Sequence, residues 1–248
     1  MDFRESTITT THLLPPLTLN RVYWRGSPND FVYEPDNVHF APRIKLVDES
    51  LRHPELIDAQ LSSSLNLLAM LPAEDECKLY QRWNVSTPPG VSPKDGCTDE
   101  NVVKYRGHHE AQQKSVNNEK ESSSRYGLNL DGTGFSERYA AQLLNDQLIF
   151  KVDTPFFNFY SRFFLPYKHY IPVKYDLSDL SEKVAWANEH VEESHRIMTQ
   201  GARLAHSLFH PDEVFCYTGL ALAAFGRLSG YKVSGVPREG VDQFEPED

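Results

Sequence analysis

The chain has 248 residues and a formal net charge of −10 at neutral pH, and 40% of its residues are hydrophobic. This length and apolar content suffice for a substantial core, in one large domain or two small ones. The acidic balance argues against nonspecific nucleic-acid binding, and no apolar run approaches the roughly 20 residues that span a bilayer. No apolar segment of the signal-peptide kind is visible at the N-terminus.

The first half of the chain is expected to alternate a few regular elements with long polar loops. Residues 1–16 are interpreted as a loose tail, and residues 17–24 as a strand that Arg25-Gly26-Ser27-Pro28 ends. Helical spacing begins at Arg43, and residues 56–61 have the pattern of a short strand. We expect residues 74–119 to be the least structured part, with a polar insertion near 84–123, because proline and glycine turns dominate there.

Residues 124–151 have the pattern of strand, tight turn, helix and strand. The turn is Asp131-Gly132-Thr133-Gly134, and apolar residues recur at helical spacing directly after it. A glycine turn before a helix N-terminus is suited to bind an anion, since free N–H groups point at the ligand. Arg138 falls in the first turn of that helix, where it disfavours the helix dipole but can face a phosphate.

Three interpretations of this motif remain open on local spacing. The first is an ordinary turn with a solvent-exposed arginine. The second is a phosphatase of the haloacid-dehalogenase type, which requires a nucleophilic aspartate where this chain carries Asn129, and an amide cannot form an aspartyl phosphate. The third is nucleotide-sugar binding, for which the rest of the chain has to provide support.

The second half is more regular. Residues 154–164 are rich in aromatic side chains, and we interpret them as a core helix in preference to a base-stacking platform. A strand at residues 169–173 is followed by helices that carry Leu180 and Ile197, and by a last helix that begins at Pro211 and has a buried apolar stripe. This alternation predicts an α/β fold, a Rossmann-like parallel sheet flanked by helices, with ligands at the carboxyl ends of the strands.

Cysteine and histidine residues give no metal-binding pattern. Cys77 and Cys97 flank a proline- and glycine-rich loop and could form a disulfide, with Cys216 buried on a helix, and an odd number of cysteines also fits three free thiols. The pairs His108-His109 and His206…His210 lack further ligands at suitable spacing, so we expect no metal site.

Four pieces of the chain, in order, resemble a known family. They are Trp24-Arg25-Gly26-Ser27, the segment LNLDGTGFSER at residues 128–138, residues 167–173, and Asp176-Leu177-Ser178. Together with the closing helix at residues 212–217 they are similar to the Rumi-like and capsule-associated protein O-glycosyltransferases, glycosyltransferase family ninety. The resemblance covers residues 21–229 and implies the C-terminal half of a GT-B enzyme.

The resemblance implies a donor site for a nucleotide diphosphate sugar, UDP-glucose or UDP-xylose, without a metal or other cofactor. By carry-over, the donor-binding residues are expected to be Ser27, Arg43, Gly132, Thr133, Gly134, Phe135, Ser136, Glu137 and Arg138, with Arg138 as the principal cation. The acceptor would be a protein or glycan hydroxyl. On this interpretation residues 17–232 form the donor-binding domain, and residues 233–248 form an acidic tail.

One departure from the family concerns the catalytic base. The family's acceptor domain, which holds an aspartate base, lies upstream of the Arg25-Gly26-Ser27 turn, and the about twenty residues before it here are too few for a Rossmann domain. No residue is therefore nominated as the base. The alternative hypothesis is a truncated, inactive nucleotide-sugar-binding remnant. Family members are expected in the ER or Golgi lumen.

Overall fold

A computed structural model describes residues 20–230, with gaps at residues 31, 62–70, 84, 86, 92–96 and 115–123, and without the side chains of residues 107–114. The predictions for the N-terminal and acidic tails lie outside the described residues, as do parts of the predicted polar insertion. Residues 1–205 and 206–248 form two units, which are described separately below.

The first unit is built on a sheet of five parallel strands. They are β1 (Val22–Gly26), β2 (Ile57–Leu61), β3 (Tyr126–Asn129), β4 (Leu148–Val152) and β5 (Ile171–Val173). Their spatial order is β2-β1-β3-β4-β5, and every neighbouring pair is parallel. The predicted α/β fold with a Rossmann-like parallel sheet is confirmed.

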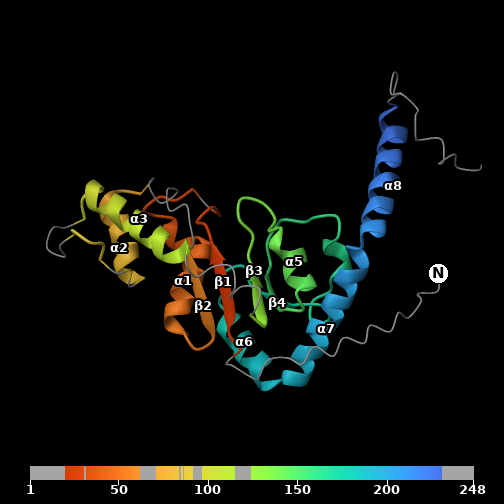
Figure 1. The fold of residues 1–248 in the computed structure, drawn as a ribbon, viewed down its shortest axis with the longest axis horizontal. Helices are drawn as coiled ribbons and strands as arrows, with labels where there is room; N and C mark the ends of the chain where they lie inside the picture. The colour runs from red at the N-terminus through yellow and green to blue at the C-terminus, as the bar shows by residue number, and fades with distance from the viewer. Residues whose placement is uncertain are drawn as a thin grey trace, which may run out of the picture. The chain divides into compact units, whose positions relative to one another are not determined.

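Helices follow the strands along the chain and lie beside them (Figure 1). The α-helices are α1 (Pro42–Arg52), α2 (Ala73–Arg82), α3 (Asp99–Lys114), α5 (Arg138–Leu144), α6 (Leu180–Glu189), α7 (Val191–Leu208) and α8 (Pro211–Ser229), and the short 3-10 helices are η1 (Val38–Phe40) and η3 (Ser161–Phe163). The helix and strand predicted in the region of residues 43–61 are confirmed as α1 and β2.

Both faces of the central strands are buried. Leu128 and Phe150 face one layer of the core, which includes Ile44 of α1 and Val184 of α6. Successive side chains of a strand point to opposite faces, so Ile149 faces the α5 side, where it is fully buried. Burial on both faces explains why strands such as Leu148-Ile149-Phe150 are continuous apolar runs.

The prediction that residues 74–119 lack structure is wrong over α2 and α3. A disulfide joins Cys77 of α2 to Cys97, and the Glu76 carboxylate, which is fully buried, accepts hydrogen bonds from Arg106 of α3. A charged residue therefore occupies a core position, where a sequence pattern leads one to expect an apolar side chain. The disulfide that the sequence left open is present.

The prediction of a core helix at residues 154–164 is also wrong. This segment is a loop that contains only the short η3 helix, and the rings of Phe157 and Phe159 are 80% and 45% exposed. Pro155 disfavours helical backbone at Thr154, and the Thr154 hydroxyl is engaged by Asp131 at the end of β3. The chain is thereby held in a non-helical path where the segment begins.

The second unit contains α8, which begins at Pro211 as predicted. The prediction of a buried stripe on this helix is wrong, because none of its residues is buried. Cys216, which was expected to be buried, is exposed.

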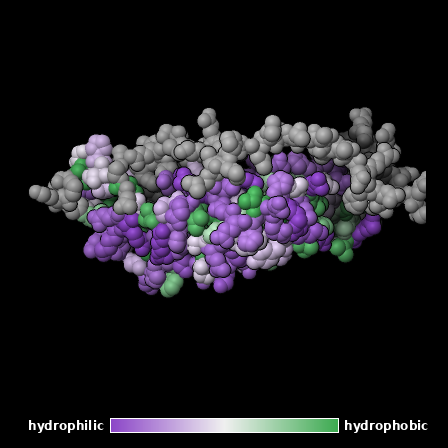
Figure 2. Space-filling model, turned by 90° about the horizontal axis from the view of Figure 1, so that it is seen from below, coloured by the Kyte–Doolittle hydropathy of each residue, from purple (hydrophilic) through white to green (hydrophobic). Residues whose placement is uncertain are grey.

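Among the described residues, no helix has the length and apolar character needed to cross a bilayer. The face of the molecule in Figure 2 is mostly hydrophilic over the described residues.

Candidate functional site

The candidate site lies at the carboxyl edge of the sheet, where three loops meet. One loop follows β1 and contains Ser27 and Asn29, the second follows β3 and runs from Asp131 to Glu137, and the third begins after β4 and contains Thr154. The carboxyl ends of parallel strands share one edge of a sheet, and ligands of open α/β sheets bind there. Contacts between these loops define the site.

Arg43 connects the first two loops. This residue lies in the first turn of α1 and is only 8% exposed. Its Nε donates to the Asp131 carbonyl at 3.3 Å, its Nη2 lies 3.5 Å from the Leu130 carbonyl, and its Nη1 donates to the Ser27 carbonyl. Burial lowers the pKa of the Arg43 guanidinium, and the nearby charge of Arg138 acts in the same direction.

Arg138 brings a second guanidinium group to the same place. It is the first residue of α5, a helix of seven residues, and it is partly buried. Its Nη1 donates to the Arg25 carbonyl at the end of β1. The two like charges repel, and the nearby carboxylates of Asp30 and Asp131 act against that repulsion at Arg43. An anionic ligand beside both guanidinium groups would act in the same direction.

The loop between β3 and α5 supplies main-chain donors beside the two arginines. The Gly132 N–H donates to the Gly134 carbonyl at 3.0 Å, and the Ser136 N–H donates to the Asp131 Oδ1 at 2.5 Å. The N–H groups of Thr133, Gly134 and Phe135 donate no hydrogen bond within the described part of the chain. Such free N–H groups in a loop can bind a phosphate oxygen.

The structure thus gathers all the sequence-predicted donor-binding residues in two adjacent loops and the arginine that joins them. Ser27 contributes its carbonyl to Arg43, and Ser136 directs its N–H inward to Asp131 rather than toward solvent. The side chains of Thr133, Phe135 and Glu137 are exposed. Whether these residues bind a donor stays a prediction.

Sequence reasoning missed the residues that organise these loops. The Asp30 carboxylate accepts from the Tyr33 hydroxyl at 2.5 Å and from the Arg43 N–H at 2.8 Å. The Asp131 carboxylate accepts from Ser136 and from the Thr154 hydroxyl. The available signal was position, since Asp30, Asp131 and Thr154 each follow shortly after the end of a strand.

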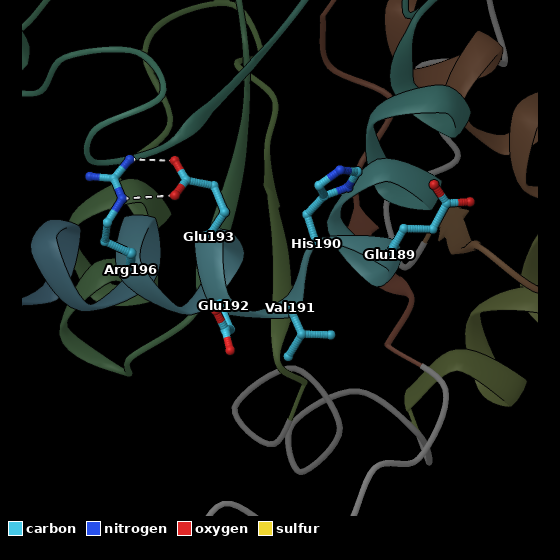
Figure 3. Close-up of a pocket in the computed structure, with 6 residues that line it drawn as sticks. All are labelled: Glu189, His190, Val191, Glu192, Glu193 and Arg196. Carbon is cyan, nitrogen blue, oxygen red and sulfur yellow. Dashed lines mark hydrogen bonds and ion pairs between the residues drawn. The ribbon is translucent and has the colours of Figure 1, made fainter.

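A surface cavity of about 620 Å³ lies elsewhere, at the junction of α6 and α7. It is lined by Glu189, His190, Val191, Glu192, Glu193 and Arg196, and Figure 3 shows the ion pair of Arg196 with Glu193 beside it. The neighbouring Ser194 hydroxyl of α7 donates to the Ala187 carbonyl of α6 at 2.9 Å, which joins the two helices beside the cavity. None of the predicted site residues lines it.

No group of three histidine, cysteine, aspartate or glutamate side chains that could hold a metal occurs among the residues described. His210 instead caps α8, since its Nδ1 accepts the Asp212 N–H at 3.4 Å. The side chains of His108 and His109 lie outside the described residues.

The sheet topology and the paired arginines define an α/β protein with a candidate anion site at the carboxyl edge of its sheet. The chain belongs to glycosyl transferase family 90, whose family model matches residues 19–247.

Three curated relatives illustrate the similarity. The human protein O-glucosyltransferase 3 is 36% identical over 125 residues, which is 50% of this chain and 24% of the relative. The zebrafish (Danio rerio) protein O-glucosyltransferase 2 is 34% identical over 121 residues, or 49% of this chain and 24% of the relative. The human protein O-glucosyltransferase 1 is 28% identical over 122 residues, covering 49% of this chain and 31% of the relative. The match thus spans only 24% to 31% of the length of these relatives.

Proposed function

We propose that this chain binds a nucleoside diphosphate sugar at the carboxyl edge of the sheet, for transfer of the sugar to an acceptor hydroxyl. The observation that carries the proposal is the proximity of two guanidinium groups at the carboxyl edge, where Arg43 contacts the loop after β3 and Arg138 contacts the end of β1. Family membership supports glycosyl transfer as the chemistry. UDP-glucose and UDP-xylose are the donors we propose to test first.

The charge distribution suits the departure of a diphosphate. As the bond between sugar and diphosphate breaks, negative charge develops on the leaving oxygen. Fixed cations and loop N–H groups stabilise that charge without reorganising, because the protein already holds them in place. Arg43 and Arg138 would therefore make their strongest contacts late in the reaction, and the proposal requires no metal ion.

Family membership supports our proposals for the acceptor and the cellular compartment. The curated relatives are named protein O-glucosyltransferases, so we propose a protein hydroxyl as the acceptor, with a glycan as the alternative. The domain would be the donor-binding half of a GT-B enzyme, working in the ER or Golgi lumen. The Cys77–Cys97 disulfide supports such a compartment, because disulfides persist in oxidising environments.

Calorimetric titration of the purified chain with UDP, UDP-glucose and UDP-xylose tests the proposal. We expect binding that Arg138→Ala weakens by roughly tenfold or more, because the variant loses a charge-assisted contact with the diphosphate. Arg203→Ala is the matched control, since Arg203 is an exposed arginine on α7 and should bind as the parent does. Titration in the presence of a chelator should give the same affinity.

Two outcomes would contradict the proposal. A folded parent chain that binds no nucleotide would contradict the donor site, and with it both the transferase and the nucleotide-sugar-binding remnant. An Arg138→Ala variant that binds UDP as tightly as the parent would remove the arginine pair from the donor site. Loss of binding in the chelator would overturn the metal-independent part alone.

A further inference from the structure

We propose that Asp131 and Thr154 are positioning residues, which hold the loop of residues 132–138 in its anion-binding shape. This inference rests on the proposed function of that loop, and neither residue was among the predicted site residues. Both are almost fully buried, at 6% and 8% exposure. They belong to different loops, since Asp131 follows β3 and Thr154 follows β4.

The Asp131 carboxylate links these two loops by hydrogen bonds. Its Oδ1 accepts the Ser136 N–H at 2.5 Å, which closes the loop over five residues, and its Oδ2 accepts the Thr154 hydroxyl. The Asp131 carbonyl in addition accepts from Arg43 Nε. One residue therefore fixes the course of the loop, its distance from the β4 loop and the orientation of a binding arginine.

Electrostatics alone does not explain a carboxylate at this position. A negative charge next to a diphosphate site repels the ligand, so by Coulomb's law Asp131 lowers the affinity for an anion. The geometric account predicts the opposite change in affinity when the carboxylate is lost. If the carboxylate holds the Thr133, Gly134 and Phe135 N–H groups in place, its loss lowers the affinity even though one negative charge has been removed.

Removing the negative charge therefore distinguishes the two accounts. Asp131→Ala removes the charge together with both acceptor oxygens, and Asp153→Ala removes the same charge from an exposed carboxylate at the end of β4. We expect Asp131→Ala to weaken UDP binding by roughly tenfold, the usual effect of losing a hydrogen bond to a charged group. Asp153→Ala should leave the affinity for UDP unchanged or raise it slightly.

Substitutions of Thr154 test the hydrogen bond between its hydroxyl and the Asp131 carboxylate. Thr154→Val removes the hydroxyl at nearly constant volume and should weaken UDP binding, whereas Thr154→Ser retains the hydroxyl and should restore most of the affinity. Binding of uridine, which has no phosphate, should change little in any variant. A role in overall stability alone would weaken uridine and UDP binding together.

Calorimetry with UDP and uridine, beside urea unfolding of each variant, decides the question. Tighter or unchanged UDP binding by Asp131→Ala would overturn the proposal, as would equal affinities for the valine and serine variants. If Asp131→Ala does not fold, the comparison of Thr154→Val with Thr154→Ser gives the answer. Failure of the parent chain to bind UDP would instead contradict the proposed function.

Discussion

At the scale of single residues, the site depends on the space around Gly132. A Cβ atom at this position would lie 2.8 Å from Asn29 Oδ1 and 2.9 Å from Arg43 Nη2, whereas a Cβ atom at Gly134 would meet no atom within 4 Å. Neither glycine has a positive φ, so backbone conformation does not require either of them. Close approach of the β1 loop and Arg43 is what excludes a side chain at Gly132.

Substitution of these two glycines should therefore have different effects. Gly132→Ala displaces Arg43 and Asn29, so we expect about 1–3 kcal/mol of destabilisation and a weaker affinity for UDP. Gly134→Ala should change the free energy of unfolding by less than about 0.5 kcal/mol. Urea denaturation of both variants is the measurement. Equal stabilities would contradict the prediction, because they would show that Asn29 and Arg43 move away from a Cβ at position 132 at little cost in free energy.

At the scale of elements, the turn before β5 is held by a hydrogen bond within the turn and by close packing against α7. The Leu165 N–H donates to His169 Nδ1 at 2.9 Å, so this nitrogen accepts a hydrogen bond and carries no proton. A Cβ at Gly201 of α7 would lie 2.5 Å from the His169 carbonyl, which shows how closely the helix packs on the turn. Burial lowers the pKa of His169, and the charge of Lys168 lowers it further.

The lowered pKa of His169 predicts the direction in which stability changes with pH. Between the lowered folded-state pKa of His169 and the unfolded value of about 6.5, the unfolded chain binds more protons, so stability rises with pH. Acidification from pH 7.5 to 5.5 should destabilise the parent more than His169→Gln, whose side-chain oxygen can still accept the Leu165 N–H. Thermal unfolding at both pH values measures this, with His39→Gln, at an exposed site, as the control. An identical pH response of His169→Gln and the parent would contradict the assignment.

At the scale of the whole molecule, α2 and α3 form a pair that covalent and ionic links hold together. The disulfide closes a segment between positions 20 residues apart in sequence, and Arg106 neutralises Glu76 in the same pair of helices. The Tyr80 hydroxyl donates to the same carboxylate at 2.7 Å. We therefore expect the stability of this part to depend on oxidation, in keeping with the proposed lumenal compartment.

Loss of the disulfide should be measurable as lost stability. Cys97→Ser should lower the free energy of unfolding by about 3 kcal/mol, because the open segment gains entropy in the unfolded state. Cys216→Ser, at an exposed free thiol, should have no such effect. Urea unfolding with and without a reductant tests both, since the reductant should destabilise the parent and leave Cys97→Ser unchanged. A parent that is indifferent to the reductant would show that the bond does not stabilise the fold.

Much of the fold and the location of the site could be predicted from the sequence. The strand, glycine turn and strand between residues 124 and 151 follow from patterns spanning a few neighbours, and α1, α6 and α7 from helical periodicity. Alternating strands and helices then restrict the sheet to parallel pairing. This restriction placed the glycine turn at the carboxyl edge before any contact was known.

Only the tertiary structure decided which side chains meet there. Arg43 and Asp131 are 88 residues apart in sequence, and Arg138 and Arg25 are 113 apart, so no local pattern links them. Glu76 occupies a core position because Arg106 neutralises it, and the Phe157 ring stays exposed because its segment is held as a loop. Local periodicity reflects a residue's near neighbours along the chain. The partners of a buried charge or a loop carboxylate depend instead on how the strands bring distant segments together.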